Sequence, residues 1–427
     1  MRFVCKKSTL TGSVEVPASK SHTIRAVALA SLAEGESRIE QPLESADARA
    51  VVRTYRALGA EIEQSPGVWH VRGTGGRLVA PDAVIDVGNS GTTLRVALGS
   101  AALLAEGEAT FTGDEQIQRR PIGPLLQSLN DLGAQAKSVR GNGSAPVVVR
   151  GRLVGGRTSI EAVTSQYLSS LLMAAPLADG DSVIDVPVLN EQPYVHMTLL
   201  WLDRLGVRYE RDALRQFRVP GRQRYQAGSV RVPADFSSAT FFLGAGVLGD
   251  NDILLRGLDL SDAQGDKAVI DYLRQMGARI DIDDEGIRVR PGTLTGCEID
   301  LNATPDALPM MAVVGCFAQG RTALVNVPQA RLKETDRIAV MAAELSRLGA
   351  KVTELPDGLI VEQSVLRGTE VDGHHDHRVV MALAVAGCTL DGETRISTAE
   401  AADVTFPTFA DCMTKLGANI QTVSETP

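Results

Sequence analysis

One short pattern occurs six times along the chain. An amphipathic segment ends in Leu or Met, a glycine and a small residue follow, and a strand-like segment of alternating polarity comes next. Glycine directly after a helix takes the left-handed conformation that ends the helix without strain. The six glycines, separated by 68 to 74 residues, are Gly59, Gly133, Gly206, Gly277, Gly349 and Gly417. This regular spacing predicts six copies of one structural unit.

A second pattern accompanies the first in each repeat. A short strand-like segment leads to small polar residues and then to an apolar segment, as in VIDVGNSGTTLRVALGSAALL. These segments are apolar on nearly all sides, which predicts buried helices. A further strand and loop precede the amphipathic helix, so each repeat is expected to contain β-α-β-α-β with room for one more strand. Three repeats make a domain of ordinary size, and we therefore expect two lobes of three repeats.

Composition limits the class of protein. The net charge is -9 and no run of Lys or Arg occurs, which argues against nucleic acid or an anionic membrane as a partner. We find neither a signal-peptide pattern nor a stretch of about 18 apolar residues, and we expect a soluble cytoplasmic protein. The five cysteines form no CxxC pair, which predicts reduced thiols in the core.

The starts of the predicted buried helices carry Ser, Thr, Asn, Asp, Lys or Arg. Free backbone N–H groups and the helix dipole make such a start suitable for binding an anion. Ser and Asp can equally serve as simple N-caps. Lys20, Arg25, Arg95 and Arg378 need another explanation, because a cation near a helix start opposes the dipole. Several anionic groups bound between the lobes would provide one.

Ten segments of the chain match one known family in sequence and order. They are SKSHTIR, GNSGTTLR, RRPIGPL, TSQYLSSLLMAAPL, PYVHMT, DFSSATFFL, PDALPMM, RLKETDR, DHRVVMAL and TFPTF. With these segments the chain resembles the 5-enolpyruvylshikimate-3-phosphate synthase family (3-phosphoshikimate 1-carboxyvinyltransferase). The resemblance implies a two-lobed inside-out α/β barrel of six βαβαββ repeats, three per lobe, with buried parallel helices. It also implies lobes of residues 19–233 and 1–18 plus 234–427, with the active site in the cleft between them.

The resemblance implies a reaction of chorismate and aromatic amino acid biosynthesis. The 5-hydroxyl of shikimate 3-phosphate adds to C2 of phosphoenolpyruvate, and the tetrahedral intermediate then loses inorganic phosphate. The family needs neither a metal nor an organic cofactor. We therefore expect two small-molecule substrates, no cofactor and a monomeric enzyme.

Site residues are assigned from the family motifs, position by position. An arginine fork suits both carboxylate and phosphate, and Gly91 is expected to let the backbone approach phosphoenolpyruvate closely. The expected ligands of shikimate 3-phosphate are Lys20, Ser21, Arg25, Thr164, Ser165, Gln166, Tyr194, Asp306, Gln329 and Lys333. The expected ligands of phosphoenolpyruvate are Lys20, Asn89, Gly91, Arg120, Gln166, Arg337, His377 and Arg378.

Two carboxylates are the candidates for proton transfer. Asp306 is expected to accept the proton of the 5-hydroxyl, while Glu334, together with Lys20, is expected to serve the methylene carbon. Taken alone, KETDR also fits an exposed helix start with i,i+3 ion pairs. The sequence HHDH at 374–377 could suggest a metal site, but no second His or Cys cluster supports one. His377 is therefore interpreted as a donor that lines the site.

Glu191 departs from the family pattern, in which many members have a serine that helps to bind the acceptor phosphate. A carboxylate that faced this phosphate would repel it. We favour a carboxylate held by a neighbouring cation from the segments SKS, RRP or KETDR. The alternative is a natural acceptor that carries less charge at this point.

Other functions stay open at this stage. A related enolpyruvyl transferase could act on another cyclitol phosphate, and a non-catalytic homologue could bind phosphorylated metabolites. The retained carboxylates and arginines argue against the non-catalytic homologue. The UDP-N-acetylglucosamine enolpyruvyl transferase of cell-wall synthesis resembles the chain only weakly, because its loop cysteine has no counterpart in GDEQIQRRP.

Overall fold

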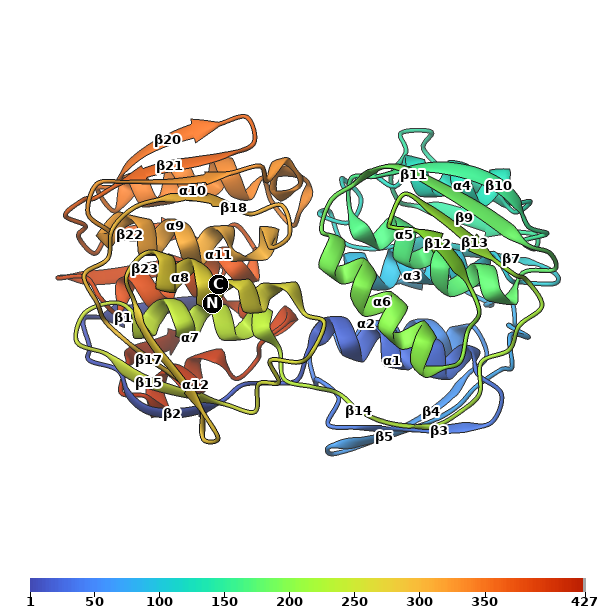
Figure 1. Ribbon diagram of the computed structural model, residues 1–427, viewed down its shortest axis with the longest axis horizontal. Helices are drawn as coiled ribbons and strands as arrows, with labels where there is room; N and C mark the ends of the chain where they lie inside the picture. The colour runs from blue at the N-terminus through green and yellow to red at the C-terminus, as the bar shows by residue number, and fades with distance from the viewer. Residues whose placement is uncertain (425–427) are drawn as a thin grey trace. The chain divides into compact units, whose positions relative to one another are not determined.

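The computed structural model describes residues 1–424, and the chain divides into two compact units (Figure 1). Unit 1 contains Met1–Pro17 and the chain from Pro233 onward, and unit 2 is the continuous segment Ala18–Val232. The lobe boundaries expected from the sequence, after residues 18 and 233, lie one residue from these positions.

The elements of unit 2 follow a repeating order of strand and helix. They are α1 (Lys20–Leu32), β3 (Glu36–Glu40), α2 (Ala46–Ala57), β4 (Glu61–Ser65), β5 (Val68–Arg72), β6 (Ile85–Asp86), α3 (Gly91–Ala101), β7 (Glu108–Thr112), α4 (Gly123–Asp131), β8 (Gln135–Ser138), β9 (Val147–Arg150), β10 (Gly156–Ala162), α5 (Ser165–Ala174), η1 (Ala175–Leu177), β11 (Ser182–Leu189), α6 (Gln192–Arg204), β12 (Glu210–Asp212), β13 (Gln216–Val219) and β14 (Ser229–Arg231).

Unit 1 begins with two N-terminal strands and continues after unit 2. Its elements are β1 (Arg2–Lys6), β2 (Thr11–Glu15), α7 (Phe236–Gly246), β15 (Asp252–Arg256), η2 (Gly265–Ala268), α8 (Val269–Gln275), β16 (Arg279–Asp283), β17 (Gly286–Arg290), β18 (Glu298–Asp300), η3 (Pro305–Ala307), α9 (Leu308–Phe317), β19 (Arg321–Val325), η4 (Pro328–Leu332), α10 (Arg337–Arg347), β20 (Lys351–Leu355), β21 (Gly358–Glu362), β22 (Glu370–Asp372), α11 (His377–Gly387), β23 (Glu393–Ser397), η5 (Ala399–Val404), α12 (Phe409–Lys415) and β24 (Asn419–Val423).

All six sheets within residues 1–424 share one strand order. Each has a parallel pair followed by two antiparallel strands, as in β6-β7-β9-β8 of unit 2 and β18-β19-β21-β20 of unit 1. Three such sheets belong to each unit. The α/β class and the six βαβαββ repeats, three in each unit, are therefore confirmed.

The first and fourth repeats exchange their opening strands. The strand β2 pairs in parallel with β15, and β14 pairs in parallel with β3. The chain thus passes from unit 1 into unit 2 after β2 and returns after β14. The strand β1 completes the sixth repeat, where it lies between β23 and β24.

Three buried helices pack together in each unit: α1, α3 and α5 in unit 2, and α7, α9 and α11 in unit 1. Every residue of α3 and α7 is buried, whereas α2 exposes one face. This confirms the distinction between wholly apolar and amphipathic helices made from the sequence. Within residues 1–424, no helix is both long and apolar enough to span a membrane.

The six repeat glycines have the conformation that their position requires. Each follows the amphipathic helix of its repeat, and their φ angles lie between 68° and 106°. Residues with a Cβ rarely adopt these angles, so the glycines explain why each helix ends where the next strand must begin.

The five cysteines are all free of disulfide bonds. Cys5, Cys316 and Cys388 are buried, as expected for core thiols. Cys297 and Cys412 are only partly buried, so the expectation of a core position is wrong for these two. Both pack against the core, Cys297 directly before β18 and Cys412 within α12.

Candidate active site

Lys20 is the first residue of α1 and is held by a carboxylate. Its Nζ lies 3.4 Å from Oδ2 of Asp47, near the start of α2, and the two side chains are 16% and 5% exposed. Ser19 caps α1 by accepting a hydrogen bond from the backbone N–H of His22. Asp47 was not identified from the sequence. In the sequence Asp47 is a single Asp in the first turn of an amphipathic helix, and the helix dipole alone is enough to explain an acidic residue there.

Arg25 lies one turn further along α1 and is 2% exposed. Its guanidinium donates to Thr198 Oγ1 (2.9 Å), Ser169 Oγ (3.4 Å) and the backbone oxygens of Ser21 (3.1 Å) and Tyr194 (3.1 Å). Within the described chain, these acceptors are all neutral. Burial lowers the pKa of Arg25 to about 10. A buried cation with neutral partners favours the approach of an anion.

Gly91 begins α3 beside two buried guanidiniums. A Cβ at this position would lie 2.5 Å from Nη1 of Arg120 and 2.6 Å from Nη1 of Arg95. Arg95 also donates to the backbone oxygen of Gly91 (3.1 Å) and lies over the ring of Tyr167. Glycine therefore leaves room for both arginines at the helix start. The expectation that Gly91 also lets phosphoenolpyruvate approach the backbone stays a prediction.

Two amides lie near the same helix starts. Asn89 donates to Asp114 Oδ2 (2.6 Å) and Gln116 Oε1 (2.5 Å), which fixes its orientation. Gln166 donates to Thr92 Oγ1 at 3.2 Å. Its Oε1 is buried without a hydrogen-bond partner within residues 1–424. Because buried polar atoms are normally paired, this oxygen is suited to accept a hydrogen bond from a substrate hydroxyl.

The start of α5 binds the carboxylate of Glu191. Its Oε2 accepts hydrogen bonds from Thr164 Oγ1 (3.1 Å), Ser165 Oγ (2.8 Å) and the backbone N–H of Ser165 (3.1 Å). These three hydrogen bonds come from uncharged groups, and the expected pairing with a cation from SKS, RRP or KETDR stays a prediction. Arg95, from GNSGTTLR, is the arginine whose pKa Glu191 raises, against the larger effect of burial.

Arg337 is the centre of a charged cluster in unit 1. It begins α10, is 1% exposed, and pairs with Asp376 (2.8 Å), Asp306 (2.7 Å) and Glu334 (2.5 Å). Burial alone would lower the pKa of Arg337, but these carboxylates raise it well above its usual range. The i,i+3 pair of Glu334 with Arg337, expected at an exposed helix start, is present here in a buried setting.

Asp306 joins this cluster to two further cations. It lies in η3, directly before α9, and its carboxylate contacts Arg378 Nη2 at 3.0 Å and Lys333 Nζ at 3.9 Å. Its side chain is 16% exposed, so it is accessible from one side. The two predicted proton-transfer carboxylates therefore share Arg337 as a partner.

Asp376 is a positioning residue that the sequence analysis missed. It is fully buried, caps α11 by accepting from the backbone N–H of Arg378 (2.9 Å), and pairs with Arg337. Burial is the largest effect and raises the pKa of Asp376, but the charge and hydrogen bond of Arg337, together with the charge of His377, lower it overall. Asp376 could have been recognised from its position directly before the helix that carries His377 and Arg378. It was not, because an Asp at this position is normally a simple N-cap.

The histidines of HHDH have different surroundings. His374 contacts the buried carboxylate of Glu344 at 2.9 Å, His375 is exposed, and His377 is buried at the start of α11. Within residues 1–424, no group of three or more His, Cys, Asp and Glu side chains could hold a metal ion. His377 is the histidine of this motif that lies next to Arg378 and to Asp376, the partner of Arg337.

Gln329 completes the set of predicted residues in unit 1. It is buried in η4, and its Nε2 donates to the backbone oxygen of Asn302 at 2.9 Å. Its Oε1 has no hydrogen-bond partner in the described part of the chain. Like Gln166 in unit 2, Gln329 therefore offers a buried acceptor for a hydroxyl.

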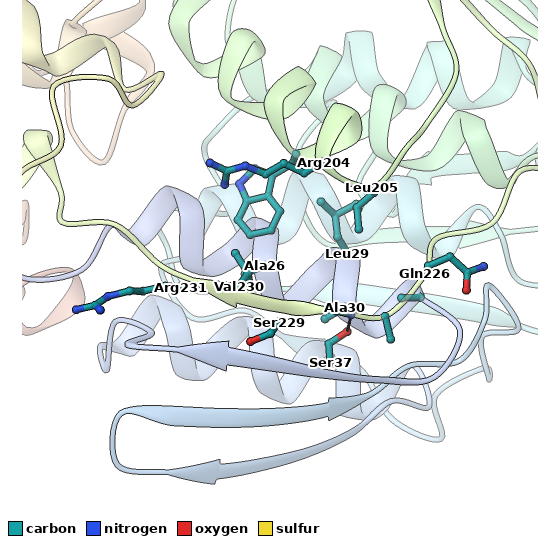
Figure 2. A pocket seen from close by; sticks show the side chains of 14 residues that line it. Ala26, Leu29, Ala30, Ser37, Arg204, Leu205, Gln226, Ser229, Val230 and Arg231 are labelled. Atoms are coloured by element: carbon teal, nitrogen blue, oxygen red, sulfur yellow. Dashed lines mark hydrogen bonds between the residues drawn. The ribbon is translucent and has the colours of Figure 1, made fainter.

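A pocket of about 500 Å³ in unit 2 is separate from these residues (Figure 2). It is lined by the second half of α1, the end of α6 and the segment around β14. Leu29, Leu205 and Val230 contribute apolar surface, and Arg204 and Arg231 lie at its edges. None of the predicted site residues lines it, so it is not part of the candidate site.

Fold and site together define an α/β protein in which polar and charged residues gather at the starts of buried helices in both units. The sequence model of the family EPSP synthase (3-phosphoshikimate 1-carboxyvinyltransferase) matches residues 4–413. The chain therefore belongs to the EPSP synthase family.

Individual relatives cover nearly the whole chain. The chain is 53% identical to a 3-phosphoshikimate 1-carboxyvinyltransferase of Acetivibrio thermocellus, over 99% of this chain and 100% of the relative. It is 50% identical to the protein of the same name from Ruminiclostridium cellulolyticum, over 98% and 99% of the two chains. A solved structure of EPSP synthase from Acinetobacter baumannii matches with a TM-score of 0.82 at 27% identity, over 99% of this chain and 100% of that one.

Proposed function

We propose that this protein transfers the enolpyruvyl group of phosphoenolpyruvate to the 5-hydroxyl of shikimate 3-phosphate and releases inorganic phosphate. Family membership and the names of the relatives support this reaction. The single observation that carries it is the cluster of Arg337 and Arg378 with Asp306 and Glu334. It combines two buried guanidiniums for an anionic substrate with two carboxylates for proton transfer.

The arginines are proposed to bind phosphoenolpyruvate. Its carboxylate and phosphate match the planar fork of guanidinium, which donates two parallel hydrogen bonds. Arg337 and Arg378 already hold carboxylates of the protein, so the substrate anions would replace Asp306 and Glu334 as partners. Arg337 keeps its pair with the buried Asp376, which fixes the guanidinium while the exchange takes place.

The exchange would prepare the carboxylates for proton transfer. Released from Arg337, Asp306 can accept the proton of the 5-hydroxyl as the O5–C2 bond forms, while Glu334 or Lys20 protonates the methylene carbon. Elimination then returns a proton from the new methyl group to Glu334 or Lys20 and breaks the bond between C2 and the phosphate oxygen, and the phosphate leaves with the proton that Asp306 had accepted. Protons and charge balance without a cofactor, and one phosphate leaves for each acceptor consumed.

Residues of unit 2 are proposed to bind the acceptor. Arg25 supplies a buried positive charge with neutral partners, and Gln166 supplies a free carbonyl oxygen for a ring hydroxyl. Thr164, Ser165 and Tyr194 lie around Arg25 and the start of α5. That residues of both units serve one reaction stays a prediction from the family resemblance. A monomeric state and a cytoplasmic location stay predictions.

The test is release of inorganic phosphate with phosphoenolpyruvate plus candidate acceptors. We expect release with shikimate 3-phosphate and none with phosphoenolpyruvate alone. The matched control is Asp306→Asn, which should remove release without removing binding. Binding of shikimate 3-phosphate with no release by the unmodified protein would instead support a non-catalytic anion-binding homologue.

A further inference from the structure

Glu191 occupies the place where the acceptor phosphate is predicted to bind. Its carboxylate takes three donors at the start of α5: the hydroxyls of Thr164 and Ser165 and the backbone N–H of Ser165. Helix starts with such donors are general phosphate-binding sites. The side chain of Glu191 is almost fully buried, so this carboxylate belongs to the packed structure and not to a mobile surface.

The backbone of Glu191 holds the carboxylate in this place. Its φ and ψ angles are 58° and 41°, a left-handed conformation that is uncommon for a residue with a side chain. Glu191 is the N-cap residue of α6, yet its side chain makes no capping hydrogen bond to that helix. It reaches the neighbouring helix α5 instead. A strained backbone that directs a buried acid to an anion-binding position suggests a functional role.

We propose that Glu191 determines acceptor specificity by competing with the acceptor phosphate for the start of α5. This inference rests on the proposed function. Carboxylate and phosphate cannot use the same donors, and two negative charges at this spacing repel each other. A phosphorylated acceptor therefore has to displace Glu191, which lowers its affinity. An acceptor that carries a neutral group here does not meet this competition.

Two arginines near the start of α5 can attract either of the competing anions, the carboxylate of Glu191 or the acceptor phosphate. Arg95 interacts favourably with the charge of Glu191. Arg25 donates to the backbone oxygen of Tyr194, whose own N–H donates to the backbone oxygen of Glu191. Positive charge therefore lies close to the start of α5 whichever anion is bound. Substitution of Glu191 removes one of the two competing anions and leaves these cations to the phosphate.

The experiment measures dissociation constants for shikimate 3-phosphate and for shikimate with the unmodified protein, Glu191→Ser and Glu191→Gln. We expect Glu191→Ser to tighten binding of shikimate 3-phosphate by about tenfold or more, with little change for shikimate. The gain should fade as salt rises. Glu191→Gln should give a smaller gain, because its amide oxygen still occupies the donors without the charge. Inorganic phosphate should raise the melting temperature of Glu191→Ser more than that of the unmodified protein.

Glu161→Ser is the matched control, since it removes an exposed carboxylate from β10, the strand that precedes α5. It should leave both dissociation constants unchanged. A change of less than about threefold in Glu191→Ser, or equal changes for both acceptors, would overturn the inference. Turnover is a separate readout. Absence of phosphate release in every variant would reject the proposed function, whereas the dissociation constants alone decide the role of Glu191.

Discussion

Arg25 of unit 2 and Arg337 of unit 1 are both almost fully buried, at 2% and 1% exposure, but their partners differ. Arg337 pairs with three carboxylates, and its pKa is raised. Arg25 donates to hydroxyl and backbone oxygens, and burial lowers its pKa to about 10. Unit 1 thus supplies carboxylates that neutralise the charge of Arg337, whereas unit 2 surrounds Arg25 with neutral hydrogen-bond acceptors.

This difference predicts how each unit responds to an anion. A ligand anion near Arg25 adds countercharge without displacing a carboxylate from Arg25 itself, so binding and stability rise together, although the acceptor phosphate must still displace Glu191 from the start of α5. A ligand anion at Arg337 must first replace a carboxylate of the protein, so the gain in affinity is smaller. The displaced carboxylate then becomes available as a base. Unit 2 is accordingly suited to binding and unit 1 to proton transfer.

The same substitution should destabilise unit 1 strongly at Arg337 and unit 2 only slightly at Arg25. Arg337→Met leaves a cluster of buried carboxylates without their common partner, and we expect a loss of about 3–5 kcal/mol in the free energy of unfolding of unit 1. Both tryptophans, Trp69 and Trp201, are buried in unit 2. Circular dichroism should therefore show an early transition that tryptophan fluorescence does not. Coincident transitions at unchanged denaturant concentration would contradict the account of Arg337.

Asp306→Asn tests whether the carboxylate of Asp306 in unit 1 takes part in proton transfer. We expect kcat to fall by at least about a hundredfold, while the dissociation constant of the acceptor changes by less than about tenfold. The amide has the same shape as the carboxylate but cannot accept the hydroxyl proton. Kinetics of phosphate release, together with acceptor titration, distinguish the two effects. Equal losses in binding and rate would make Asp306 an orienting ligand.

Gly91→Ala perturbs the arginines of unit 2 without removing a charge. The new Cβ would displace Nη1 of Arg120 and of Arg95, both at less than 3 Å. Because these are the ends of flexible side chains, we expect the fold to persist and KM for phosphoenolpyruvate to rise by about tenfold, with a smaller change in kcat. Ser90→Ala, one residue earlier, is a control for a change at the same helix start. An unchanged KM would show that the arginines move aside without loss of binding.

Arg25→Met should have the smallest effect on stability. The pKa of about 10, well below the ordinary value for arginine, implies a cost of about 3 kcal/mol for keeping this arginine charged, which about four hydrogen bonds offset. We therefore expect a change of less than about 1 kcal/mol in the free energy of unfolding of unit 2, followed by tryptophan fluorescence. Stabilisation by phosphate should nevertheless disappear.

The difference in the free energy of unfolding between the unmodified protein and Arg25→Met should increase with pH. Below about pH 10 folded and unfolded Arg25 are both protonated, so the cost is fully present. Between about pH 10 and 12.5 the unfolded state binds more protons than the folded state, and the unmodified protein gains stability relative to Arg25→Met. A difference that stays constant as pH rises through 10 would indicate an ordinary pKa for Arg25.

Local rules account for most of the fold. The repeat glycines and the contrast between apolar and amphipathic helices depend on residues close in sequence, and both were predicted correctly. The crossing of the first strand came from the family resemblance and not from the residues. The return exchange, in which β14 pairs with β3, was not foreseen, because strand partners separated by nearly the whole of unit 2 leave no local signal.

The candidate site shows the same limit. Helix starts with Lys20, Arg25 and Arg378 were found because a cation there contradicts the dipole rule. The donors of Thr164 and Ser165 to Glu191 were not foreseen, although the parallel pair of β10 and β11 brings Ala162 opposite Leu189. Parallel strands deliver the residues that follow them to the same edge of the sheet, which places Thr164 and Ser165 beside Glu191. Reading the repeats as paired strands would have revealed this contact.

The placement of β1 between β23 and β24 has a consequence for synthesis on the ribosome. The strand β1 ends at Lys6, and β23 begins only at Glu393. At roughly 5–20 residues per second, β1 waits roughly 20–80 seconds for its partners, while every strand of unit 2, including β14, is complete long before. The nascent chain therefore carries two unpaired N-terminal strands, β1 and β2, beside a finished domain. Until their partners are made, the edges of these two strands are open to pairing with other chains.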